Sequence, residues 1–188
     1  MRLNEKTWPG MLLISAAIGL QAFAADDAIS TASLLAEMID YSAVARWPEP
    51  AYVCRQDGSW DRRTKTKDDA NGWFANGDNM EMMGASAKWE QHQGRNECLM
   101  LDVEGPGAIV RFWSGGAKPK GTVRFYLDGA ETPAIEAPLY DLLGGKSFAL
   151  KPIAIMNSGE GINLYLPIPY AKRCRITYDE GKPPAPPP

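Results

Sequence analysis

The chain has 188 residues, of which 45% are hydrophobic and 23% charged, with 18 glycines and 15 prolines. This is the composition of a globular, loop-rich protein. Its 20 basic and 23 acidic residues give a net charge of -3, which argues against a nucleic-acid partner because phosphate neutralisation needs a basic surface. His92 is the single histidine, so HExxH and three-histidine metal sites are excluded and we expect no bound metal.

Residues 1–24 have the pattern of a signal peptide. Arg2 and Lys6 supply a positive start, residues 11–24 are apolar except for Gln21, and the run ends in the small-x-small pattern of residues 22–24. We expect cleavage before residue 25 and export to the periplasm or the exterior. The run is shorter than the roughly 20 residues that a membrane helix needs, although an uncleaved anchor is the alternative. The mature chain then has 164 residues, net charge -4, one domain and no membrane partner.

The three cysteines, Cys54, Cys98 and Cys174, lie far apart in the sequence. An odd number allows at most one disulfide, and three pairings are open. Unpaired cysteine is among the most buried residue types. We therefore expect small buried apolar side chains, and a Cys3His zinc site lacks the short spacing it needs.

One helix is expected near the start of the mature chain. Ser33 is predicted to cap a helix over residues 34–40. The apolar residues of that segment share one face and are expected to pack against the main domain: Leu34, Leu35, Met38 and Ile39.

Residues 40–96 are dense in glycine, asparagine, aspartate and proline, which predicts a turn-rich region with short strands inside it. Trp60 and Trp73 argue against disorder. Structured loops of this length inside a compact domain are usually functional.

From Cys98 onward, short β-rich runs alternate with glycine and proline about every ten residues. We predict an all-β protein, an antiparallel β-sandwich or jelly roll with one short N-terminal helix. The predicted strands span residues 98–103, 108–113, 122–127, 133–139, 147–152, 162–170 and 173–179.

Period-two alternation predicts which side chains share a face of a strand. Arg111 and Trp113 point one way, and Val110 and Phe112 point the other. In the same way Asn163 and Tyr165 lie opposite residues 162, 164 and 166. Two strands therefore carry a polar-aromatic face.

The sequence lacks the residues that several kinds of catalytic or binding site require. His92 stands in a polar turn and no GxSxG elbow accompanies it, so a nucleophilic triad is not expected. No phosphate cradle of the GxxxxGK[ST] or GxGxxG type follows a strand, so no nucleotide cofactor is expected. Asp68, Asp69 and Asn71 lack the spacing of a calcium loop and are interpreted as turn formers.

Carbohydrate chemistry remains, because sugars bind to aromatic faces and planar polar side chains and are hydrolysed by two carboxyl groups. Any one of these residues is more often structural. The candidates are Trp60, Trp73, Trp89, Trp113 and Tyr165, with Arg62, Asn76, Asp78, Arg111 and Asn163.

Four segments in order, residues 58–78, 101–115, 121–145 and 161–179, resemble signature blocks of the DUF2961 family, domain of unknown function 2961. Part of that family is classed as glycoside hydrolase family 172. The resemblance covers about residues 33–180 and implies a jelly-roll domain over residues 25–180. It also implies activity on furanosides, a second jelly roll, and assembly into trimers or larger oligomers.

The proline-rich segment 181–188 stands where the second jelly roll is expected, and is interpreted as a tail or a truncated linker. The family's catalytic glutamates are expected in that later part, so no catalytic residue is carried over. Glu81, Glu104, Glu136 and Glu160 match no catalytic motif. The substrate-binding candidates within the matching blocks are Arg62, Trp73, Asp78, Arg111, Trp113, Asn163 and Tyr165.

Three functions are consistent with these features. The chain is the first jelly roll of an exported furanosidase-like protein that lacks its catalytic glutamates. Alternatively it is a module that binds carbohydrate without cutting it, or an assembly subunit whose partner supplies the carboxylates.

Overall fold

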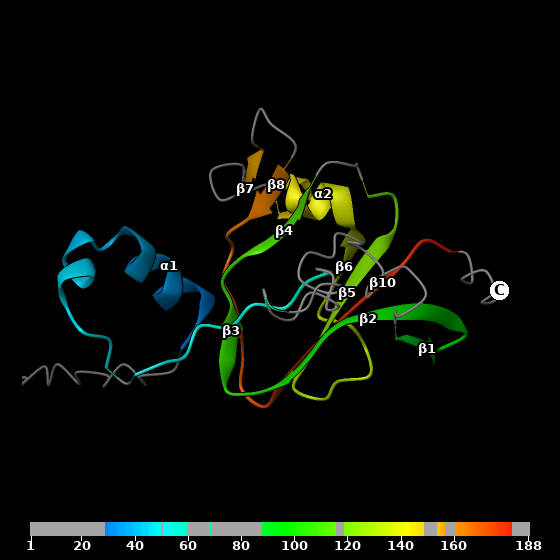
Figure 1. Cartoon of the computed structure of the whole chain (residues 1–188), viewed down its shortest axis with the longest axis horizontal. Helices are drawn as coiled ribbons and strands as arrows, with labels where there is room; N and C mark the ends of the chain where they lie inside the picture. Colours follow the sequence, from blue (N-terminus) through cyan, green and yellow to red (C-terminus); the bar gives the residue numbers. More distant parts are fainter. Residues whose placement is uncertain are drawn as a thin grey trace, which may run out of the picture.

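In the computed structural model, two layers of antiparallel strands pack face to face (Figure 1). The structure describes residues 29–49, 51–59, 68, 88–115, 119–148, 154–156 and 161–181. The predicted signal peptide and Arg62, Trp73 and Asp78 lie outside these residues. Within the described ranges, no helix is long and apolar enough to cross a membrane. The predicted β-sandwich is confirmed.

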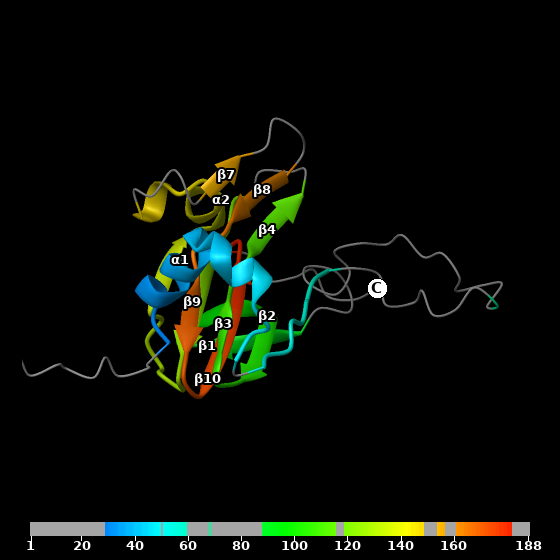
Figure 2. The same cartoon turned by 90° about the vertical axis from the view of Figure 1, so that its left-hand side faces the viewer.

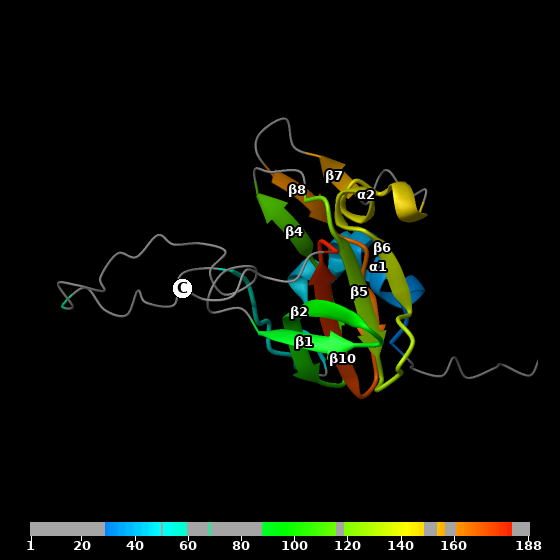
Figure 3. The ribbon, with the colours of Figure 1, turned by 90° about the vertical axis from the view of Figure 1, so that its right-hand side faces the viewer.

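The larger layer is a five-stranded sheet in the order β1-β2-β10-β5-β6, with every pairing antiparallel. Its strands are β1 (Trp89–His92), β2 (Arg95–Glu104), β5 (Thr122–Leu127), β6 (Ile135–Pro138) and β10 (Arg173–Asp179). Gln93 and Gly94 join β1 to β2 with φ angles of 50° and 78°. Two positive φ angles in a two-residue loop are typical of a type I′ hairpin turn, whose twist matches that of the strands. Figure 3 shows this sheet.

The second layer consists of two small sheets that follow one another along the same chain segments. β3 (Gly107–Ile109) pairs with β9 (Ile168–Tyr170), and β4 (Phe112–Gly115) pairs with β8 (Gly161–Leu164), which also pairs with β7 (Ala154–Met156). The predicted strands 108–113 and 162–170 are therefore each divided in two. Pro167 lies at the division and has no N–H to donate to a ladder.

The core lies between the two layers. β5 and β10 contribute Val123, Phe125 and Ile176, each at most 2% exposed, and the second layer contributes Leu164 and Ile168. Phe112 of β4 meets Phe125 edge to face, with ring centroids 5.5 Å apart. Burial of one such side chain contributes about 2 kcal/mol.

Residues 121–122 approach β10 too closely for a side chain at position 121. A Cβ on Gly121 would overlap the carbonyl oxygen of Asp179 and the Tyr178 ring. The Gly121 N–H instead donates to the Tyr178 hydroxyl at 2.9 Å. This contact fixes the start of β5 against the end of β10.

Helical turns follow β6, and one of them overlaps the predicted strand 147–152. Strand β6 ends at Pro138, and α2 (Leu139–Leu143) follows it. Leu139, Leu142 and Leu143 are buried on one side of α2 because i, i+3 and i+4 fall on one helix face. Lys146–Phe148 form a 3-10 helix where a strand over 147–152 was expected.

The N-terminal helix α1 (Thr31–Ile39) begins earlier than predicted. Its N-cap is Ser30, and Ser33 forms the other half of the capping box. Ser30 and Ser33 both have the hydroxyl that a cap requires, so the sequence pattern alone does not distinguish them. Figure 2 shows α1 in front of β9, where the Thr31 hydroxyl donates to the Pro167 carbonyl at 3.2 Å and Leu35 packs on the core.

The rest of the predicted apolar face of α1 does not pack as expected. Met38 and Ile39 are 55% and 77% exposed. A 3-10 helix (Tyr41–Ala45) follows, and neither helix contains a buried residue.

Two of the three cysteines are buried, as predicted, whereas Cys54 is exposed. The ladder between β2 and β10 aligns Cys98 with Tyr178 and Cys174 with Val103. The two buried thiols are thus several residue steps of about 3.3 Å apart, too far for a disulfide. Burial raises the pKa of Cys98 to about 11 and that of Cys174 to about 12.

Candidate functional site

Four of the predicted site residues lie together on the outer face of the second layer. Arg111 donates from Nε and Nη2 to Oδ1 of Asn163, at 3.1 and 2.9 Å. Its guanidinium carbon also lies 5.3 Å from the ring centroid of Trp113 and 5.8 Å from that of Tyr165. These four residues are called the Arg111–Asn163 cluster below.

Strand pairing places the cluster. Trp113 on β4 is directly opposite Asn163 on β8, and side chains of directly opposed residues are neighbours on one face. Arg111 and Tyr165 are two residues from Trp113 and Asn163 respectively, so alternation brings them to the same face. The predicted alternation is confirmed for Phe112 and Leu164, which face the core. It is wrong for Val110, which was expected beside Phe112 but is 53% exposed, because residues 110–111 lie in the break between β3 and β4.

Exposure differs within the cluster. Asn163 is 4% exposed, whereas Trp113 is 48% exposed and Arg111 is also exposed. The buried amide therefore anchors the guanidinium from below, and the indole and guanidinium face solvent. The two cation–π contacts hold the guanidinium beside the aromatic rings, and such contacts contribute about 0.5–1 kcal/mol at exposed sites.

This chemistry suits carbohydrate. An exposed aromatic face stacks on the C–H groups of a sugar ring, and the guanidinium and amide donate hydrogen bonds to hydroxyls. Hydrolysis needs two carboxyl groups about 5–10 Å apart beside the bond. Among the described residues, the polar contact of Arg111 is with an amide, and no carboxylate joins the cluster.

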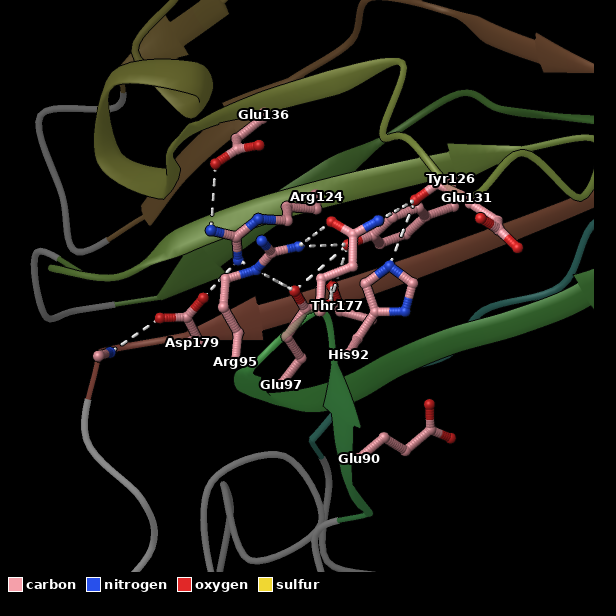
Figure 4. A network of polar contacts seen from close by, with 12 residues as sticks. Glu90, His92, Arg95, Glu97, Arg124, Tyr126, Glu131, Glu136, Thr177 and Asp179 are labelled. Carbon is pink, nitrogen blue, oxygen red and sulfur yellow. Dashed lines mark hydrogen bonds and ion pairs between the residues drawn. The ribbon is translucent and has the colours of Figure 1, made fainter.

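A second polar cluster lies on the five-stranded sheet, on the side away from the core (Figure 4). Its centre is Glu97, which is fully buried and accepts hydrogen bonds from Thr177 at 2.7 Å and Arg95 Nε at 2.8 Å. The Tyr126 hydroxyl donates to the same carboxylate at 3.1 Å.

Arg124 completes this second cluster. It is 5% exposed and forms ion pairs with Glu97 at 3.4 Å, with Glu136 at 3.1 Å and with Asp179. The seven residues are called the Glu97–Arg124 network: Arg95, Glu97, Arg124, Tyr126, Glu136, Thr177 and Asp179.

Electrostatics keep Glu97 ionised. Burial alone would raise its pKa, but hydrogen bonds from Thr177, Arg95 and Tyr126 and the charge of Arg124 outweigh burial and lower it. A buried, fully engaged carboxylate cannot protonate a glycosidic oxygen. The network is therefore a structural element of the sheet.

None of the site residues predicted from the sequence belongs to this network. Alternation in the segment Thr122–Leu127 sets Arg124 and Tyr126 opposite Val123 and Phe125, and the same rule sets Thr177 and Asp179 together on β10. That signal was available in each strand. The pairing that joins Glu97 of β2 to them through β10 is long-range and has no local signature.

The other candidates are placed as follows. His92 ends β1, with Nε2 donating to the Glu131 carbonyl at 3.3 Å and its ring against Tyr126. Glu81 and Glu160 lie outside the described residues, as do Trp60, Asp69, Asn71 and Asn76. In the described part of the chain, no three His, Cys, Asp or Glu side chains are grouped as for a metal ion.

Comparison with known proteins identifies the domain. Residues 50–185 match the family model of the first β-sandwich domain of glycoside hydrolase family 172. No curated protein and no solved structure matches the chain. The match covers well over half of the sequence, and the chain belongs to this family.

Proposed function

We propose that this first β-sandwich domain of an exported family 172 protein binds furanoside carbohydrate through the Arg111–Asn163 cluster and does not itself hydrolyse it. The observation that carries the proposal is the Arg111 guanidinium, fixed by a buried amide beside the half-exposed Trp113 indole. The resemblance to furanoside-active enzymes supplies the sugar class.

The non-hydrolytic part of the proposal is supported by the placement of two carboxylates among the described residues. Glu97 is fully buried, Glu136 pairs with Arg124, and neither belongs to the cluster. A domain of this kind can hold a substrate while carboxyl groups from elsewhere act on it.

Titration calorimetry of the mature chain with fructofuranose and arabinofuranose oligosaccharides tests the proposal. We expect heat of binding without release of sugar over long incubation. Trp113→Ala should weaken binding at least about tenfold, because the stacking of a sugar ring on the indole is lost. Val110→Ala is the matched control, since Val110 is 53% exposed and next to the cluster but is not one of its residues.

Two results would contradict the proposal. If no furanoside binds, the cluster is not a carbohydrate site. If the purified chain releases sugar, the domain contains hydrolytic carboxylates and its non-hydrolytic role is wrong.

A second role, as an assembly surface for another copy of the chain, is favoured by residues 29–53, called the N-terminal arm. The arm exposes eight large apolar side chains: Ile29, Met38, Ile39, Tyr41, Val44, Trp47, Tyr52 and Val53. Trp47 and Tyr52 line an open hollow between α1 and the chain that follows it. Large apolar side chains exposed in number along one segment are typical of a surface that another chain covers.

Light scattering tests this role. We expect the mature chain to form oligomers, as its resemblance to trimeric proteins implies, and Trp47→Ser with Tyr52→Ser to lower the mass toward that of one chain. A monomer at every concentration of the unsubstituted chain would reject the assembly role.

A further inference from the structure

The charge of Arg111 is compensated differently from that of most arginines in the structure. The other paired arginines of the described residues have carboxylate partners. These are the pairs Arg46–Asp40, Arg95–Glu97, Arg173–Asp102 and Arg175–Glu90 and the three ion pairs of Arg124. Arg111 is held by the neutral amide oxygen of Asn163. Its positive charge is therefore fixed in position but not neutralised within the described residues.

The donors of Arg111 are only partly used. A guanidinium has five N–H groups, and Asn163 Oδ1 accepts from Nε and from Nη2. The two N–H groups of Nη1 and one of Nη2 remain for a ligand. A planar pair of N–H donors matches a carboxylate or phosphate group in two parallel hydrogen bonds.

The aromatic neighbours set the orientation of that free edge. Trp113 and Tyr165 both lie within cation–π distance of the guanidinium. Trp113 is held opposite the anchoring Asn163 by the β4–β8 pairing. A sugar ring stacked on the exposed part of the indole would thus place a ring substituent beside Arg111.

We infer that the cluster takes an acidic saccharide, one whose ring carries a carboxylate or phosphate substituent that pairs with the free edge of Arg111. The inference rests on the proposed carbohydrate-binding function. It adds the charge of the ligand, which neither the family match nor the proposed function specifies.

Matched ligands test the inference on the intact mature chain. Titration calorimetry at low salt compares methyl arabinofuranoside 5-phosphate with methyl arabinofuranoside, and methyl fructofuranoside 6-phosphate with methyl fructofuranoside, so that charge changes while the furanose ring is kept. We expect each anionic ligand to bind about tenfold or more tightly than its neutral counterpart, and the preference to shrink as salt is raised, because exposed charges are screened.

Substitutions test whether Arg111 is the source of the preference for anionic ligands. Arg111→Gln should abolish the preference for the anion, and Arg111→Lys should keep a reduced preference because it retains the charge but loses the planar pair of donors. Lys120→Gln removes another exposed cation outside the cluster and should change nothing. Circular dichroism verifies that each variant is folded.

The possible results distinguish a failure of the inferred anion preference from a failure of the proposed carbohydrate-binding function. If neutral saccharides bind as tightly as acidic ones, the inference is wrong and the carbohydrate-binding function stands. If no saccharide of either kind binds, both fail. If Arg111→Gln retains the anion preference, the anion binds elsewhere and the inference is wrong.

Discussion

Two arginines of this domain occupy opposite environments. Arg124 is buried on the five-stranded sheet and surrounded by three carboxylates. Arg111 is exposed on the other layer, is held by one amide and lies within cation–π distance of two aromatic rings. Both residues come from short β-rich runs, so the type of partner and the burial, not the residue type, separate the structural cation Arg124 from the cation that we propose binds a ligand.

The difference also determines what each arginine contributes to folding. Loss of Arg124 leaves buried carboxylates without a counter-charge, which is costly because charge is poorly solvated in the interior. Loss of Arg111 returns an amide and two partly exposed rings to water. The comparison therefore predicts opposite effects on stability and binding.

The largest effect is expected for Arg124→Gln. It should lower the free energy of unfolding by about 3 kcal/mol, because Glu97 and Asp179 lose their shared cation. Arg111→Gln is the matched control and should stay within about 0.5 kcal/mol of the unsubstituted chain. Urea denaturation measures both, and equal losses would show that the two environments do not differ as described.

A smaller loss is expected for Thr177→Val, which keeps the shape of the side chain and removes its hydrogen bond to Glu97. Because that bond joins a hydroxyl to a buried carboxylate, its loss should cost about 1.5–3 kcal/mol. Thermal unfolding would measure it. A variant as stable as the parent would mean that Arg95, Tyr126 and Arg124 satisfy Glu97 without the threonine.

The contribution of Glu97 to folding stability should also depend on pH. The folded pKa of Glu97 is lowered, so its stabilisation is present above its ordinary pKa of about 4.5 and is lost as pH falls through the lower folded value. The stability advantage of the parent over Glu97→Gln should therefore shrink between about pH 7 and pH 3. A constant difference across that range would contradict an ionised Glu97.

The smallest effect concerns reactivity and leaves stability unchanged. At neutral pH a thiol reagent should label Cys54 rapidly and the two buried cysteines only after denaturation, since thiolate is the reactive form and burial raises their pKa values to about 11 and 12. Cys54→Ser should abolish rapid labelling. Rapid labelling of that variant would show that β2 or β10 opens readily.

The fold was largely predictable because its strands are short, alternating and separated by turn residues. Segments 122–127 and 173–179 were predicted with the bounds that β5 and β10 have. The predictions failed where a local pattern had two solutions, as for Ser30 against Ser33, and where Lys146–Phe148 form a 3-10 helix at the start of a predicted strand. The short helix after Pro138 was not predicted, although its leucines have the period of a helix.

Part of the candidate site was also predictable from alternation within two strands, which grouped Arg111 with Trp113 and Asn163 with Tyr165. That these two pairs meet depends on the register of β4 and β8, which no single segment encodes. Glu97 was missed for the same reason, because its partners come from β5 and β10. Exposure, which separates the two arginines, also depends on that long-range packing.

The interruption between the paired strands of the second layer has a consequence for how such domains diversify. Ile109 pairs with Ile168 and Phe112 with Leu164, so two residues on one side of the interruption face three on the other. The ladders on either side fix their registers independently of these five residues. An insertion or a new side chain at positions 110–111 would therefore reshape the surface around the guanidinium while the core face of both sheets keeps its alignment.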